Sequence, residues 1–219
     1  MKKSVYLFLA FITLLILFTP NLIAHALEEV IYIDPGHGGY DGGCVGNGLI
    51  EKDINLKVAY KLQDYLETAG FKVKLTRNED TALDGEKAED IYKRVRMINN
   101  SNTLLYISIH ANSYPHESVK GAQVFYHQSD NNKALATSIQ NYLRNLDIYN
   151  TREAKSYKGK YILDHIEKPG CLVEVGFLTS PVDADKLKDD IYLSNVAFAV
   201  YLGIMAYLDI WWYYENNNC

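Results

Sequence analysis

The chain has 219 residues, of which 48% are hydrophobic and 22% charged, and its formal net charge is -5. This composition is typical of a globular protein and excludes a largely disordered chain. The 22 Lys and Arg residues are scattered rather than gathered into a stripe or tail, so nucleic acid is not expected as a partner.

The N-terminal segment has the features of an export signal. Lys2 and Lys3 precede an apolar run, and Ala24-His25-Ala26 supplies small residues at the two positions that a signal peptidase reads. Residues 1–26 are therefore expected to be a signal peptide or, alternatively, an N-terminal membrane anchor, because residues 5–24 are just long enough to span a bilayer. Either interpretation places the rest, residues 27–219, outside the cytoplasm as one domain.

Strand-like and helix-like segments alternate along this domain. A short apolar run predicts a first strand at 30–33, and the sequence DPGHGG that follows predicts a loop at 34–39. Apolar residues at helical spacing predict a helix at 52–69, with Gly70 at its end. By the same criteria, strands are expected at 71–76, 104–109, 122–127 and 171–175, a loop at 78–88, and helices at 91–98, 135–146 and 191–208.

This alternation predicts an α/β fold in three layers, with a mostly parallel or mixed central sheet of about six strands flanked by helices. The aromatic run at 211–214 has no functional interpretation from sequence alone. Three scattered cysteines do not suggest a disulfide scaffold.

Polar residues at the predicted ends of strands indicate where chemistry would occur. In open α/β sheets, ligands bind beyond the carboxyl ends of the strands, where His37, His110 and Asn112 are expected. A catalytic zinc ion typically takes three ligands from histidine and carboxylate side chains, so a carboxylate is still needed. Glu51 can supply it, because the glycine-rich loop after His37 can fold back onto the start of the helix. Cys44 is a weaker alternative ligand.

Each of these residues also has an ordinary structural interpretation. A glutamate in the first helical turn is favoured by the helix dipole alone. His37 and His110 could each hydrogen-bond only to nearby backbone. The three residues support a metal site chiefly because they occur together.

Glu174 is unusual because its neighbours in the predicted strand at 171–175 are apolar. An unpaired carboxylate buried there would cost several kcal/mol. A nearby zinc ion would offset that cost, and the glutamate would then be placed to accept a proton from the attacking water. A salt bridge to Arg or Lys in the core is the structural alternative.

Four segments resemble the signature blocks of the zinc-dependent N-acetylmuramoyl-L-alanine amidases of the Amidase_3 family. They are DPGHGG at 34–39, Glu51, SIHAN at 108–112 and EVGFL at 174–178. The resemblance implies an amidase/phosphorylase-like fold, peptidoglycan as substrate, and one Zn²⁺ held by His37, Glu51 and His110. It also implies that Glu174 is catalytic.

Further segments resemble the sporulation-associated branch of this family that is called CwlD: TREAK at 151–155, GKYIL at 159–163 and KPG at 168–170. This resemblance implies a role in spore cortex maturation through muramic lactam formation, a role in germination, and a helper lipoprotein as a partner. The site would face the intermembrane space of the forespore or the wall side of the membrane. The chain departs from the family at Gly42, where relatives often have proline, and at 179–181, where Ser-Asn-Pro is usual.

Three residues beside the signature blocks are expected to contact substrate: Asn112, Arg152 and Leu163. Other functions also fit the residues. A zinc carboxypeptidase or a polysaccharide deacetylase would use the same ligands and base. An inactive wall-binding or regulatory protein on the same fold is the alternative outside enzymology.

Overall fold

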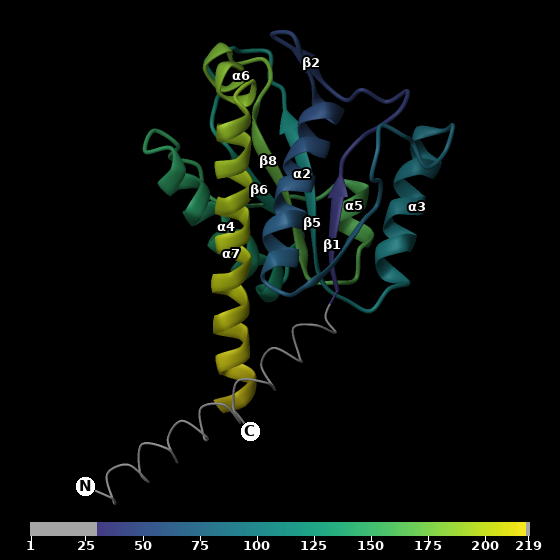
Figure 1. Ribbon diagram of the computed structural model, residues 1–219, viewed down its shortest axis with the longest axis vertical. Coiled ribbons are helices and arrows are strands. Elements are labelled where there is room, and N and C mark those ends of the chain that lie inside the picture. The colour runs from purple at the N-terminus through teal and green to yellow at the C-terminus, as the bar shows by residue number, and fades with distance from the viewer. Residues whose placement is uncertain (1–29, 218–219) are drawn as a thin grey trace, which may run out of the picture.

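The computed structural model describes residues 30–217 and, within them, the side chains up to residue 209. The predicted leader at 1–26, with its anchor segment at 5–24, lies outside the described residues. The described chain forms three layers, with a sheet between two groups of helices (Figure 1). The predicted three-layer α/β fold is therefore confirmed.

The strands and helices alternate along most of the chain. The strands are β1 (Val30–Pro35), β2 (Val45–Gly46), β3 (Leu49–Ile50), β4 (Lys72–Leu75), β5 (Thr103–Asn112), β6 (Gln123–Tyr126), β7 (Lys155–Ser156) and β8 (Gly170–Phe177). The helices are α2 (Glu51–Thr68), α3 (Lys87–Asn99), α4 (Asp130–Leu146), α5 (Tyr161–His165), α6 (Pro181–Leu187) and α7 (Asp190–Asn217).

The central sheet is mixed, as expected, and has six strands in the order β4-β1-β5-β8-β6-β7. The strands β4, β1, β5 and β8 are mutually parallel, whereas β6 is antiparallel to β8 and carries β7 parallel to itself. The two central strands, β5 and β8, are the longest, and β8 is buried along its whole length. Their carboxyl ends therefore form a rigid edge.

Alternate side chains of the parallel strands point to opposite faces of the sheet. On one face, Ile33, Ile107 and Val173 belong to the main core, which α2, α4 and α7 cover (Figure 1). On the other face, Tyr106 and Leu172 belong to a smaller core beneath α3 and α5. The same alternation continues toward the carboxyl ends and places polar side chains on the α3 and α5 face.

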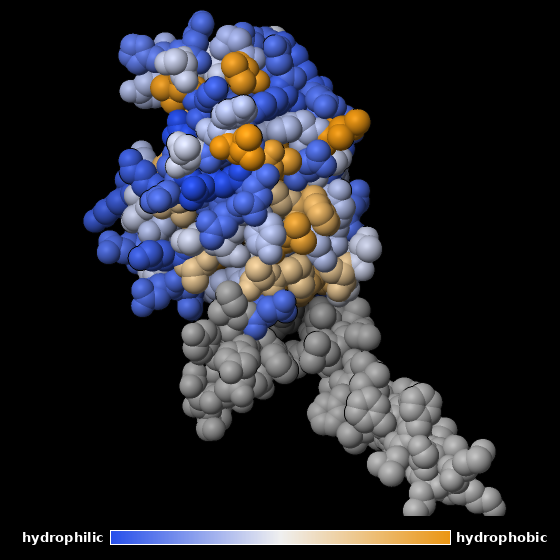
Figure 2. All heavy atoms as spheres, turned by 90° about the vertical axis from the view of Figure 1, so that its left-hand side faces the viewer, coloured by the Kyte–Doolittle hydropathy of each residue, from blue (hydrophilic) through white to orange (hydrophobic). Residues whose placement is uncertain are grey.

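Helix α7 is a core helix. Leu193, Val196, Val200 and Ile204 are all almost fully buried, and the helix packs against α2 and α4. By length and composition alone, Asp190–Asp209 could also cross a membrane, and it is the single such helix found within the described residues. The side of the domain on which α4 lies is mostly hydrophilic, with small separate apolar patches (Figure 2).

Several short elements were not predicted from the sequence. The two-residue strands β2, β3 and β7 and the helices α5 and α6 are too short to produce a clear periodic pattern. Helix α3 begins at Lys87, inside the predicted loop 78–88, and α7 continues through the aromatic run at 211–214. These differences change the ends of elements and leave the order of the long elements as expected.

A buried ion network ties α3 to the end of β1. Arg94 donates hydrogen bonds to the Asp34 carboxylate at 2.9 Å and to the Asp90 carboxylate at 2.6 Å. The exposed fractions of Asp34 and Arg94 are 0% and 2%. Burial alone would raise the pKa of Asp34, but Arg94 and the hydroxyls of Thr76 and Ser108 outweigh it and hold that pKa below its usual value.

We predict that Arg94→Met destabilises the domain by about 3–5 kcal/mol, because it leaves the Asp34 carboxylate buried without its cation. Urea unfolding at pH 7 measures this change. The loss should shrink in acid: a lowered native pKa stabilises the fold above about pH 4, and this contribution disappears as the pH falls through the native value. Lys93→Met, which removes an exposed ion pair of the same helix, is the control and should have a far smaller effect. Equal effects of the two variants would contradict the prediction.

Candidate active site

Three potential metal ligands converge from three separate segments. His37 lies in the loop after β1, Glu51 is the first residue of α2, and His110 lies near the end of β5. One ligand atom from each residue lies within 4.8 Å of the others. The structure thus brings together the three residues that the sequence analysis selected as ligands.

Glu51 lies at the centre of this group. Its Oε1 is 2.9 Å from Nδ1 of His110 and 3.2 Å from Nε2 of His37, and its Oε2 accepts a hydrogen bond from the backbone N–H of Cys44 at 2.8 Å. The side chain is only 3% exposed. Burial would raise the pKa of Glu51, but its contacts with both imidazoles outweigh burial and hold the pKa far below its usual range. The Glu51 carboxylate is therefore ionised and available to a cation.

The backbone around the ligands is shaped to let them approach. His37 has a φ of 63°, in the left-handed region that a residue with a side chain adopts at a cost. A Cβ atom on Gly36 would lie 2.2 Å from the His110 ring, and one on Gly43 would lie 2.5 Å from Glu51 Oε2. Glycine at these two positions leaves the space that the ligand side chains occupy.

Asp41 holds the His37 ring in place. Its Oδ2 is 2.8 Å from Nδ1 of His37 and 3.0 Å from the Lys87 ammonium, and its Oδ1 accepts from the Gly43 N–H at 3.1 Å. Burial would raise the pKa of Asp41, but these partners lower it to about 2. A carboxylate on one histidine nitrogen leaves the other free for a metal and fixes the ring orientation. Asp41 could not be predicted from spacing, because it and His37 lie in an irregular loop without helical periodicity.

Glu174 lies beside the ligand group. It is the register partner of His110 on the neighbouring strand β8, and it is only 4% exposed. Its Oε1 is 3.5 Å from the ammonium of Lys160, and its Oε2 is buried without a hydrogen-bond partner among the described residues. Burial is the main reason that the pKa of Glu174 is raised. The alternative of a salt bridge within the core does not describe this pair, because the Lys160 side chain is 38% exposed.

Two further residues selected from the sequence, Cys44 and Asn112, have side-chain partners outside the ligand group. The Cys44 sulfur contacts the Ser113 hydroxyl at 3.0 Å, and Cys44 is not part of the ligand group. Asn112 ends β5, and its side-chain oxygen accepts from the Ser113 N–H. Its backbone oxygen accepts from the N–H of Leu178.

Arg152 and Leu163 differ in exposure. Arg152 is partly exposed, donates to the Gln123 side chain at 2.7 Å and lies over the Phe177 ring. Because Gln123 is the register partner of Glu174 on β6, Arg152 borders the site. Leu163 is 1% exposed in the core beneath α5, so any contact with substrate there would have to be made by its neighbours.

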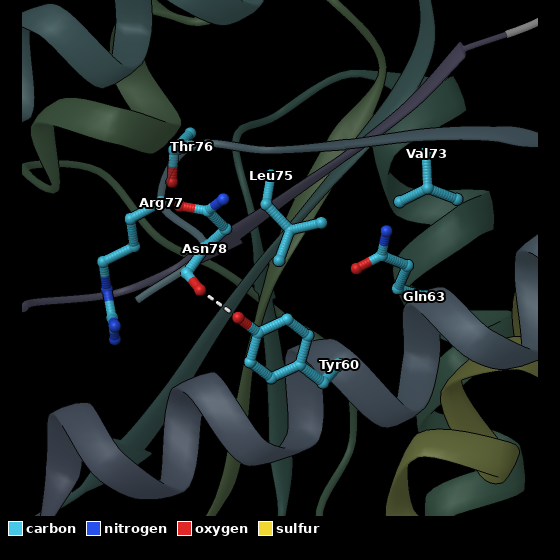
Figure 3. Close-up of a pocket in the computed structure, with 7 residues that line it drawn as sticks. All are labelled: Tyr60, Gln63, Val73, Leu75, Thr76, Arg77 and Asn78. Carbon is cyan, nitrogen blue, oxygen red and sulfur yellow. Dashed lines mark hydrogen bonds between the residues drawn. The ribbon is translucent and has the colours of Figure 1, made fainter. Parts of the chain in front are cut away.

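A surface pocket of about 490 Å³ lies apart from this group, between α2 and β4 (Figure 3). The residues that line it are Tyr60, Gln63, Val73, Leu75, Thr76, Arg77 and Asn78. The Tyr60 hydroxyl donates to the backbone oxygen of Asn78 across it. No histidine, cysteine or carboxylate lines the pocket, so it offers neither the ligands nor the base of a hydrolytic metal site.

Comparison with known proteins identifies relatives over most of the chain. The germination-specific N-acetylmuramoyl-L-alanine amidase of Bacillus subtilis (strain 168) is 45% identical over 188 residues, which cover 82% of this chain and 79% of that protein. The CwlD amidase of Clostridioides difficile, solved in complex with the GerS lipoprotein, matches with a TM-score of 0.81 and 35% identity, over 84% of this chain and 100% of that one.

A more distant structure has the same fold. The N-acetylmuramoyl-L-alanine amidase AmiC2 of Nostoc punctiforme matches with a TM-score of 0.75 and 32% identity, over 83% of this chain and 97% of that one. The family model Amidase_3, described as N-acetylmuramoyl-L-alanine amidase, matches residues 31–206. This match spans nearly the whole described domain and all four residues of the site, and the chain therefore belongs to the Amidase_3 family of N-acetylmuramoyl-L-alanine amidases, with a CwlD-like protein among its relatives.

Proposed function

We propose that this protein is a zinc-dependent hydrolase that cleaves the amide bond between N-acetylmuramic acid and L-alanine in peptidoglycan. The observation that carries the proposal is the convergence of two imidazoles and a buried carboxylate beside a second buried carboxylate, Glu174. Two histidines, one carboxylate and a further glutamate are the donor set and base of metal-assisted amide hydrolysis. The family relationship supplies the substrate.

The donor set fits Zn²⁺. His37, Glu51 and His110 would hold it, and the glycines at 36 and 43 leave room for their side chains. When bound, Zn²⁺ polarises the substrate carbonyl and lowers the pKa of water to about 7.

Glu174 does the proton chemistry. Its unpartnered oxygen is available to accept a proton from the attacking water and to deliver it to the departing nitrogen. The amide C–N bond breaks, which leaves a carboxylic acid on the lactyl group and an amine on L-alanine. Asp41 keeps the His37 ring oriented throughout. Asn112, two residues after His110, and Arg152, which donates to the register partner of Glu174, are placed to contact the substrate.

We further propose that the reaction belongs to spore cortex maturation, by the route that forms muramic lactam, and to germination. The similarity to a germination-specific amidase supports this role. The C. difficile CwlD amidase was solved with a lipoprotein, which supports a helper lipoprotein for this chain as well. Both functions require that the domain be exported, either released or held by the segment 5–24.

Product analysis tests the proposed reaction against its rivals. Isolated sacculi are digested with the zinc-loaded protein, with and without chelator, and the products are weighed by mass spectrometry. An amidase releases whole stem peptides, a carboxypeptidase removes single terminal amino acids, and a deacetylase removes only acetate. A wall-binding protein without activity would leave every mass unchanged at full zinc occupancy with the helper present.

Replacing the proposed base should separate metal binding from catalysis. We expect Glu174→Gln to keep its zinc and to lose about 10²- to 10⁴-fold in turnover, the range for general acid–base groups. Metal analysis and muropeptide kinetics on the same sample measure both quantities. Glu117→Gln, an exposed glutamate, is the control. Near-normal turnover of Glu174→Gln at matched zinc loading would reject the assigned base.

Removing one of the proposed metal ligands should abolish both zinc binding and catalysis. We predict that His37→Ala loses bound zinc and amide hydrolysis together, because one of three protein ligands is gone. The comparison is His116→Ala, which changes an exposed histidine outside the ligand group and should keep both. A His37→Ala protein with one zinc per chain would show that the metal binds elsewhere.

Loss of the Asp41 carboxylate should weaken metal binding without removing a ligand. We expect Asp41→Asn to lower zinc affinity by about 10- to 100-fold, as for other partners that orient metal-bound histidines. Competition with a chromophoric chelator gives the affinity, and Asp64→Asn, an exposed aspartate of α2, serves as the comparison. An unchanged affinity would mean that the Asp41 contact does not orient His37 for the metal.

A further inference from the structure

The two oxygens of the Glu174 carboxylate have different surroundings. Oε1 lies 3.5 Å from the Lys160 ammonium, whereas Oε2 is buried without a partner among the described residues. We propose that Lys160 is a positioning residue for catalysis: it holds Oε1 and so leaves Oε2 directed to the water whose proton Glu174 accepts. This inference rests on the proposed function, because it assigns a partner to the base of that reaction.

The backbone fixes where Lys160 begins. Lys160 is the N-terminal cap of α5, and its carbonyl oxygen accepts hydrogen bonds from the N–H groups of Leu163 and Asp164, both at 3.0 Å. The preceding Gly159 has a φ of 103° and donates its N–H to the Asp164 carboxylate at 2.7 Å. Leu163 anchors the helix in the core. The lysine therefore starts from a rigid turn, and its side chain reaches the site from a fixed point.

Several charged or titratable groups from separate elements lie near Glu174. They include His110 on β5, Glu51 on α2 and Lys160 at α5, and Cys44 in the loop before β2 is a further titratable neighbour. Burial raises the pKa of Glu174 and Glu51 adds to this, whereas His110 and Lys160 lower it. Nδ1 of His110 already contacts the Glu51 carboxylate at 2.9 Å. Within the described part of the chain, Lys160 is thus the cation that pairs with the Glu174 carboxylate.

The contact is poorly explained as a stabilising salt bridge. The Lys160 side chain is more than a third exposed, and such pairs contribute little to folding. One carboxylate oxygen is also left buried and unpartnered, which a pair selected for stability would avoid. An arrangement with one paired oxygen leaves the other oxygen of the carboxylate for proton transfer.

Steady-state kinetics on muropeptides tests the inference, with Lys160→Met, Lys160→Arg and Lys158→Met compared at matched zinc loading. Lys158 is an exposed lysine two residues earlier in the same loop and is the control. We expect Lys160→Met to lower kcat by about 10- to 100-fold with KM changed by less than about twofold. Lys160→Arg should recover most of the loss, and Lys158→Met should match the unmodified protein.

Two further readouts separate positioning from a merely structural role. The acidic limb of the kcat/KM profile should move to higher pH in Lys160→Met, because the ionised form of the base loses its cation. Crystal structures of the zinc-loaded proteins should show the Glu174 carboxylate turned away from its original orientation in Lys160→Met alone. Zinc content and the thermal unfolding midpoint should be the same as in the control.

The outcomes are distinct. A raised KM with unchanged kcat would show that Lys160 binds substrate, and unchanged kinetics with an unmoved carboxylate would show that it has no role; either result overturns the inference. If the unmodified protein with bound zinc releases no stem peptide, the proposed function fails instead. In that case the orientation of Glu174 in the two crystal structures still decides whether Lys160 positions it.

Discussion

The structure depends on keeping negative charge buried at one edge of its sheet. Asp34, Glu51 and Glu174 are each less than 5% exposed. Asp34 and Glu174 lie toward the carboxyl ends of parallel strands, and Glu51, at the start of α2, contacts His110 there. A buried carboxylate is costly unless cations or hydrogen-bond donors surround it. Asp34 has such a set in Arg94, Thr76 and Ser108, so its charge is balanced within the protein.

The other two carboxylates are balanced less completely. Glu51 has two imidazoles and a backbone N–H, and Glu174 has one partly exposed lysine on one of its oxygens. The buried carboxylates at this edge of the sheet therefore differ in role. Asp34, whose charge is fully balanced, ties α3 to β1 and makes the frame rigid. Glu51 and Glu174, whose charges are not fully balanced, provide negative charge that a bound divalent cation would neutralise.

Much of this arrangement was predictable from the sequence. The long periodic segments gave the three layers and the order of the main elements, because periodicity depends only on which face each residue buries. Glu174 was recognisable because a carboxylate in an otherwise apolar strand needs an explanation. His37, Glu51 and His110 were grouped by the positions expected for ends of strands and the start of a helix, and the structure brings them together.

The contacts that support the site were not predictable in the same way. Asp34 read as part of a turn, and its pairing with Arg94 crosses 60 residues of chain, which no local pattern encodes. Lys160 belongs to a five-residue helix that leaves no periodic trace. The peptidoglycan substrate and the spore-specific role came from family resemblance, whereas the zinc ligands and the base were also suggested by residue chemistry. The expectation for Leu163 did not consider that apolar neighbours of a motif usually fill the core.

One feature of the sheet determines how freely the rest of the protein can vary. His110 and Glu174 are paired across neighbouring strands, so the spacing between the proposed ligand and the proposed base is set by main-chain hydrogen bonds. The surface loops do not determine the distance between these two residues. Surface loops away from these two strands can therefore be exchanged or lengthened without changing the distance between His110 and Glu174. Residues on the sheet can therefore stay fixed while the loops that select the substrate are changed. This makes the fold a suitable starting scaffold for redesigned wall-degrading enzymes.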